Sequence, residues 1–276
     1  MAAAKGGGKR LLVPLLLAAV VYAFWSTVYV WPLRLFVVLL HEVSHGLAAV
    51  ATGGRIVSIE LSPAEGGLCT TAGGWPFVIS SAGYLGSALW GAFFLVLGAT
   101  GRPRTHRALT ALLGAALVVL TLVYVRSAFG FAYGLAAGAL LLGVARWLPE
   151  GASSFVLRLL GVTSLLYAPW DVTSDLILRS VPASDASALA RATGIPALAW
   201  GLLWLAASVL VAAWAVVRVG RGVRSCFSTI AKRYSRKSRP GPTLPNSDLC
   251  ARREKTPAKP GRVTMIGARG RRANSC

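Results

Sequence analysis

Apolar stretches long enough to cross a lipid bilayer recur along this chain, and they limit the folds open to it more than any other feature. Hydrophobic residues make up 55% of the 276 residues, and charged residues only 14%. Inside a bilayer the backbone must satisfy its own hydrogen bonds, which favours helices. The strands of a membrane barrel would alternate apolar and polar residues, and these stretches do not.

The apolar stretches predict an all-α polytopic membrane protein with six or seven transmembrane helices. The first stretch continues through two tryptophans without a clear cleavage site, which favours a retained helix over a signal peptide. The expected helices cover residues 11–30, 33–51, 76–99, 108–126, 128–147, 153–177 and 197–217. Pro182, Ser184 and Asp185 indicate a loop before the last of them.

Two further segments differ from the apolar helices. Residues 55–73 combine β-branched positions with a central Pro-Ala-Glu-Gly-Gly turn, which predicts a short β-hairpin. Residues 218–276 have no apolar period and contain five prolines, which predicts a disordered tail. We therefore expect a basic lead over 1–10, a membrane-embedded domain over 11–217 and a disordered basic tail over 218–276.

The formal net charge of +20 arises mostly from the tail. A tail beside anionic lipid headgroups explains these charges without a nucleic-acid partner, which we do not expect. The basic connections near residues 101–107 and 146–158 would share the side of the tail, and the positive-inside rule makes that side cytoplasmic. With seven spanning helices the basic lead would lie on the opposite side, against the same rule.

The sequence His41-Glu42-Val43-Ser44-His45 is the strongest candidate for a functional site. The chain has only three histidines, and two of them lie four residues apart within an apolar helix, on one helical face. Two imidazoles so placed can bind one Zn²⁺ at about 2.0–2.1 Å. Glu42 is rotated by about 100° and can reach a water at the metal as a general base. Ionisable groups at membrane depth are expensive and therefore functional candidates.

A catalytic zinc needs a third protein ligand and an open position. Besides Glu42, the acidic residues within or at the edge of apolar helical stretches are Asp171 and Asp175. They too are separated by one helical turn. Asp171 is the preferred third ligand, and Asp175 is an alternative ligand or a carboxylate that orients a histidine. The four cysteines form no Cys-x-x-Cys pair and suggest neither a disulfide framework nor a cysteine zinc site.

Several stretches resemble the site-2-protease clan of intramembrane zinc metallopeptidases, and most closely its compact, M50B-like branch. They are His41-Glu-Val-Ser-His45-Gly-Leu-Ala-Ala, Gly53-Gly-Arg-Ile-Val-Ser-Ile-Glu60, Ser80-Ser-Ala-Gly-Tyr-Leu-Gly-Ser-Ala-Leu89, Trp170-Asp-Val-Thr-Ser-Asp175 and Ser184-Asp-Ala with Thr193-Gly-Ile-Pro196. The resemblance covers about residues 15–217. It implies zinc on His41 and His45, with Glu42 as the base and an aspartate of a later helix as third ligand. That aspartate is usually followed by glycine, whereas Val172 follows Asp171 here.

The expected function is an intramembrane zinc metalloendopeptidase that hydrolyses peptide bonds of membrane-spanning or membrane-proximal substrates. Segment 55–71 is expected either to pair with an unwound substrate strand or to be a simple surface hairpin. The departure at Val172 keeps an alternative, in which the protein is an inactive pseudoprotease or another membrane metalloprotein acting as a scaffold. A third hypothesis makes the helices a mere anchor for the basic tail, although one helix would suffice for that.

Overall fold

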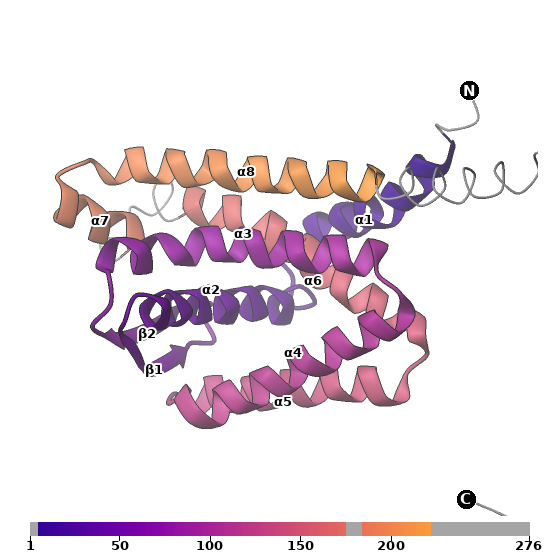
Figure 1. Cartoon of the computed structure of the whole chain (residues 1–276), viewed down its shortest axis with the longest axis horizontal. Coiled ribbons are helices and arrows are strands. Elements are labelled where there is room, and N and C mark those ends of the chain that lie inside the picture. The colour runs from indigo at the N-terminus through magenta and orange to yellow at the C-terminus, as the bar shows by residue number, and fades with distance from the viewer. Residues whose placement is uncertain (1–4, 175–183, 222–276) are drawn as a thin grey trace, which may run out of the picture. The chain divides into compact units, whose positions relative to one another are not determined.

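The computed structural model describes residues 5–174 and 184–221, and side chains from residue 11 onward. Figure 1 shows a helical bundle with one two-stranded sheet. Its elements are α1 (Lys5–Ala23), α2 (Trp31–Ala51), β1 (Arg55–Leu61), β2 (Gly67–Ala72), α3 (Pro76–Thr100), α4 (Pro103–Tyr124), α5 (Ala128–Trp147), α6 (Glu150–Thr173), α7 (Asp185–Thr193) and α8 (Ala197–Arg221).

Six of these helices are long and apolar enough to cross a membrane, which confirms the predicted class of fold. They are α2, α3, α4, α5, α6 and α8. Many of their large apolar side chains are exposed, among them Leu112, Leu140 and Leu210, as expected for surfaces solvated by lipid. The protein is a multi-pass membrane protein. Residues 222–276 lie outside the described part, so the predicted disorder of the tail stays a prediction.

The first and last parts of the bundle differ from the sequence prediction. The first apolar stretch was expected to be one helix over 11–30, but α1 ends at Ala23, and only 11–23 count as its apolar part. Asp185 was expected in a loop, yet it begins α7. Ser184 caps that helix by accepting a hydrogen bond from the Ser187 N–H, and Gly194 ends it at a φ of +76°.

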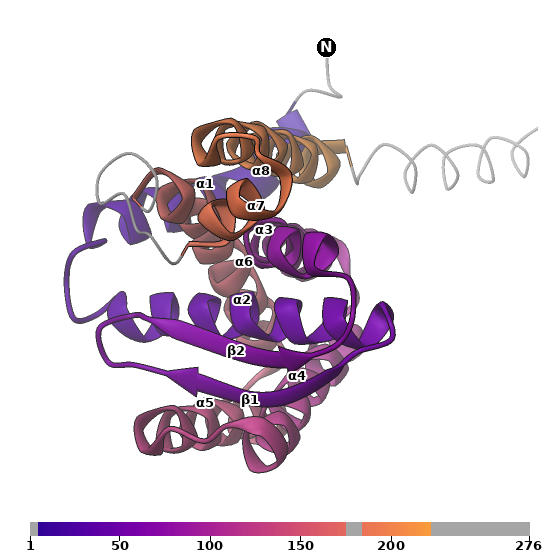
Figure 2. The same ribbon diagram turned by 90° about the vertical axis from the view of Figure 1, so that its left-hand side faces the viewer.

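Helix α3 is the central packing element of the bundle. It packs against α2, α6 and α8, and α4 and α5 form an antiparallel pair beside them (Figures 1 and 2). Close approach depends on glycines: a Cβ at Gly91 would lie 2.9 Å from Leu165, and one at Gly161 would lie 2.5 Å from the backbone of Leu95. Glycine removes this obstacle and brings helix backbones together in membranes.

The β1–β2 hairpin is attached at both its outer strand and its turn. The outer edge of β1 is covered where Ile59 pairs with Val125, and where Ser127 Oγ bonds both the N–H and the carbonyl of Leu61 at 2.9 and 3.0 Å. At the turn, Arg34 of α2 forms a 2.8 Å ion pair with Glu65. The hairpin therefore lies along α2, and its second strand β2 packs against that helix.

Candidate metal centre

Helix α2 presents the two histidines of the H-E-x-x-H sequence side by side. Trp31-Pro32 begins the helix with proline in the first turn, where its missing N–H costs nothing. Separated by one turn, the rings of His41 and His45 lie with centroids 4.8 Å apart. His45 is 7% exposed and Glu42 6% exposed, so these polar groups are inside the protein and not on its lipid surface.

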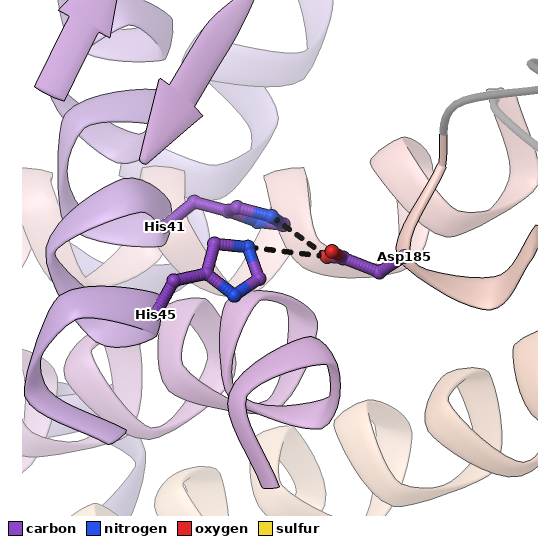
Figure 3. A group of neighbouring side chains, drawn as sticks. All are labelled: His41, His45 and Asp185. Atoms are coloured by element: carbon purple, nitrogen blue, oxygen red, sulfur yellow. Dashed lines mark hydrogen bonds and ion pairs between the residues drawn. The ribbon is translucent and has the colours of Figure 1, made fainter. Parts of the chain in front are cut away.

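Asp185 brings a carboxylate to both histidines. Its Oδ2 atom lies 3.2 Å from Nε2 of His41 and 3.2 Å from Nε2 of His45. Figure 3 shows the carboxylate at the start of α7 facing both imidazole rings of α2 from one side. Helix α7 is held in this position by packing against α3 and α8, with Ala186 and Leu189 buried in the contact.

The two aspartates singled out from the sequence are placed differently. Oδ2 of Asp171 lies 3.7 Å from Nδ1 of His41, on the other side of the imidazole from Asp185. Asp175 lies outside the described residues. The structure therefore brings Asp185, and not Asp171, to the Nε2 atoms. Sequence reasoning passed over Asp185 because it lies in a polar segment, although its Ser-Asp-Ala neighbourhood belongs to the stretches that carry the family resemblance.

Hydrogen bonding fixes which nitrogen of His45 is free to bind a ligand. Its Nδ1 lies 2.7 Å from the carbonyl oxygen of Ile79, an atom that can only accept. Nδ1 therefore carries the hydrogen, and the neutral ring keeps its lone pair on Nε2. Nδ1 of His41 has no hydrogen-bond partner within the described part of the chain. The Asp171 carboxylate faces this nitrogen at 3.7 Å, which is an ion-pair distance.

The donor set fits a zinc ion. Three ligand atoms, one from each of His41, His45 and Asp185, lie within 4.8 Å of one another. Tetrahedral zinc with ligands at about 2.0–2.1 Å requires ligand atoms about 3.3 Å apart. Both nitrogen–oxygen separations are 3.2 Å. Two imidazoles and one carboxylate are also a typical ligand set of catalytic zinc, which keeps one position open.

Asp185 has the charge that a metal ligand needs. Burial by itself would raise the pKa of its carboxyl group, but when His41 and His45 are protonated, the hydrogen bonds that their Nε2 atoms donate and their positive charge lower the pKa to about 2. Asp185 is thus an anion at physiological pH. The nearby Cys69 thiol behaves in the opposite way, because burial and the Glu42 carboxylate raise its pKa to about 12. A protonated thiol is neither a nucleophile nor a ligand, so the chemistry of this site falls to the histidines and carboxylates.

Glu42 is held by the hairpin. Its carboxylate accepts a hydrogen bond from the backbone N–H of Cys69 in β2. Gly67, two residues earlier in the strand, leaves room for it, because a Cβ at Gly67 would lie 2.6 Å from Cγ of Glu42. The Glu42 carboxylate is therefore oriented by the N–H of Cys69 at the edge of β2. It is not one of the three candidate ligands His41, His45 and Asp185.

All of these groups line one cavity of about 470 Å³. Its walls come from α2, the hairpin turn and β2, the beginning of α3, the end of α6 and the beginning of α7. The polar lining residues are His41, Glu42, His45, Glu65, Ser80, Tyr84, Tyr167, Asp171, Ser184 and Asp185. A cavity of this size, lined by two histidines and four of the chain's nine acidic residues, is the natural candidate for an active site.

Gly83 of α3 faces both imidazoles, and replacing it by alanine should disrupt the metal centre. A Cβ at this position would overlap Nε2 of His41 and lie 2.6 Å from Cε1 of His45. We expect Gly83→Ala to lose at least tenfold in zinc affinity, measured by competition with a chromophoric chelator. Gly151→Ala is the matched control, because a Cβ there meets nothing within 4 Å. Equal zinc affinity in the two variants would contradict the geometry described.

The fold and the site together define a class: multi-pass membrane proteins with a buried pair of histidines, a glutamate between them in sequence and a facing aspartate. Comparison with family models identifies the family. The chain belongs to the family described as peptidase M50B-like, whose model matches residues 14–215. This finding confirms the resemblance to site-2 proteases stated from the sequence. Comparisons with curated proteins and with solved structures find no match.

Proposed function

We propose that the protein is an intramembrane zinc metalloendopeptidase that cleaves membrane-spanning or membrane-proximal polypeptides. The observation that carries the proposal is the convergence of His41, His45 and Asp185 on one wall of a cavity that Glu42 also lines. Membership of the peptidase M50B-like family supports it. In this proposal Asp185 replaces Asp171 as the third ligand.

The metal ligands would be Nε2 of His41, Nε2 of His45 and the carboxylate of Asp185. Asp171 would orient His41 from its Nδ1 side, as carboxylates commonly do for zinc-binding histidines. When bound, zinc supplies Lewis acidity that polarises the scissile carbonyl and lowers the pKa of water.

Glu42 would carry the proton through the reaction. Its carboxylate takes a proton from the water whose oxygen attacks the carbonyl carbon, and the N–H of Cys69 keeps it in position. When the carbon–nitrogen bond breaks, Glu42 gives that proton to the leaving amine. Water is consumed, and the products are a carboxyl group and an amine.

The hairpin offers a way to hold an extended substrate. A peptide bond in a helix is hidden, so a substrate must unwind before it is cut. The outer edge of β1 is covered by Val125, whereas Leu68 and Cys69 of β2 line the cavity. An unwound segment that pairs with the edge of β2 opposite β1 would lie next to Glu42.

Removal of the metal tests the proposal. Protein purified in detergent should contain about one zinc per chain by plasma mass spectrometry, and chelation should abolish cleavage of a single-pass reporter. Added zinc should restore cleavage. The alternative function, a membrane metalloprotein without protease activity, predicts the same zinc content with no cleavage before or after chelation. Protein that binds no zinc would contradict both functions.

A further inference from the structure

One face of α3 forms a wall of the cavity beside the proposed metal ligands. Ser80, Gly83 and Tyr84 are separated by three and four residues and therefore lie on one side of the helix, where Ser80 and Tyr84 line the cavity. Gly83 faces the imidazoles directly. A Cβ at this glycine would lie 2.6 Å from Cε1 of His41 and 2.6 Å from Cε1 of His45. The backbone of α3 at Gly83 thus lies next to the nitrogens that would hold the metal.

Ser80 lies one turn before Gly83 and beside His45. The carbonyl oxygen of the preceding residue, Ile79, lies 2.7 Å from Nδ1 of His45 and accepts its hydrogen bond. Cβ atoms three residues apart on a helix face are separated by about 5–6 Å. An oxygen held at about 2 Å from zinc can accept a hydrogen bond from a hydroxyl oxygen about 2.7–2.8 Å away. Ser80 is therefore close enough to reach a substrate oxygen at the metal without being a ligand.

The hydroxyl of Ser80 is available as a donor. Helical Ser and Thr hydroxyls often donate to a carbonyl one turn earlier, as Ser87 of α3 does at 3.0 Å. Ser80 makes no hydrogen bond of this or any other kind within the part of the chain that the structure describes. The other hydroxyl on this face belongs to Tyr84, whose ring packs against His41 and against Trp204 with centroids 5.1 Å apart in each pair. Tyr84 supports the His41 ring, and Ser80 is left to contact a substrate.

The cavity supplies no cationic side chain for a negatively charged oxygen. None of the described residues that line it is Lys or Arg, and its acidic lining residues are Glu42, Glu65, Asp171 and Asp185. In the proposed function Nε2 of His41 and Nε2 of His45 bind zinc, so neither of them can donate a hydrogen bond. A carbonyl oxygen that gains negative charge here therefore needs a neutral donor in addition to the metal.

We propose that Ser80 is a catalytic residue that donates a hydrogen bond to the oxygen of the scissile carbonyl, an inference that rests on the proposed function. As the water oxygen adds to the carbonyl carbon and Glu42 takes a water proton, one electron pair of the C=O double bond moves to the carbonyl oxygen. The Ser80 O–H stabilises this developing charge more than it stabilises the neutral carbonyl. When the carbon–nitrogen bond breaks, the pair returns to the carbonyl and Glu42 protonates the leaving nitrogen. Ser80 keeps its own proton throughout.

Ser80→Ala and Ser81→Ala form a matched pair of variants that test this role. Both serines are partly exposed neighbours on α3, but Ser81 lines an apolar groove with Leu85 and Leu89 and not the cavity. Since a hydrogen bond to a charged acceptor is lost, we expect Ser80→Ala to lower kcat for a single-pass reporter about 10–100-fold. KM and zinc content should stay unchanged, because the bond strengthens only in the transition state. Ser81→Ala should cleave as the unmodified protein does.

Ser80→Thr distinguishes a donor from a packing residue. Threonine keeps the hydroxyl, so this variant should recover most of the rate that Ser80→Ala loses. Equal kcat in Ser80→Ala and Ser81→Ala overturns the proposal. An equal loss of kcat in Ser80→Thr and Ser80→Ala overturns it as well, because the role would then be one of packing.

Binding of a transition-state mimic separates this inference from the proposed function. The probe is a peptide in which a phosphinate, a tetrahedral anion, replaces the scissile amide, and its affinity for zinc-loaded protein is measured by calorimetry in detergent. Ser80→Ala should weaken binding about 10–100-fold, and Ser81→Ala should not change it. If the unmodified protein cleaves nothing, the proposed function fails, and the affinities of the two variants still decide whether Ser80 donates to an anion at the metal. Equal affinities overturn the inference, and so does zinc-loaded protein that does not bind the phosphinate.

Discussion

Replacing Glu42 by glutamine should abolish peptide-bond hydrolysis and leave the zinc content unchanged. Glutamine keeps the size of the side chain, but its amide cannot take a proton from water. General-base catalysis contributes about 10²–10⁴ in rate, so we expect the cleavage rate of a single-pass reporter to fall by a factor in this range. Rates are compared by quantitative immunoblotting, and zinc is measured in the same preparations.

Glu60→Gln is the matched control, because Glu60 is exposed on β1 and does not line the cavity. Its cleavage rate should stay within about twofold of the unmodified protein. If Glu42→Gln cleaves as fast as this control, the proposed base is wrong. If neither protein cleaves while both hold zinc, the scaffold function becomes the better interpretation.

Replacing Asp185 by alanine should remove the metal, and replacing Asp171 by alanine should only weaken its binding. Oδ2 of Asp185 faces both Nε2 atoms at 3.2 Å, whereas Asp171 lies 3.7 Å from Nδ1 of His41. Loss of one of three protein ligands should leave less than a tenth of the zinc after dialysis. Loss of a group that orients a histidine typically costs about 10–100-fold in affinity or activity.

Chelator competition on both variants separates these two roles. The preference for Asp171 from the sequence makes the opposite prediction, with zinc lost in Asp171→Ala and retained in Asp185→Ala. Equal zinc loss in the two variants would mean that both carboxylates bind the metal. Tryptophan fluorescence and gel filtration of each variant show whether the bundle stays folded, so that metal loss is not mistaken for unfolding.

The parts of this molecule that depend on local sequence could be predicted. Helical spacing alone put His41 and His45 on one face, and the turn around Glu65 indicated the hairpin. The runs of apolar residues gave the spans, because in lipid a helix is the only local solution for such a segment. These features need no knowledge of how distant segments meet.

The position of Asp185 could not be obtained in this way. It is 144 residues from His41 in sequence, and its approach depends on the packing of α7 against α3 and α8. Asp171 and Asp175 seemed better candidates because they interrupt an apolar stretch, and burial of a charge is a strong signal. That signal found Asp171, which lies beside His41, but it misses a ligand supplied by a short polar helix.

Gly67 links the length of the hairpin turn to the position of Glu42, the proposed base. The glycine lies against Glu42, and a Cβ at this position would lie 2.6 Å from Cγ of Glu42, so a larger residue would displace the Glu42 side chain. In a strand, a slip of one residue exchanges the faces of all side chains. One residue added to or removed from the turn would bring a different residue of β2 opposite Glu42. Leu68, which follows Gly67 in the strand, is one such residue. The number of residues between Glu65, which is paired with Arg34, and the N–H of Cys69 thus determines the position of Glu42.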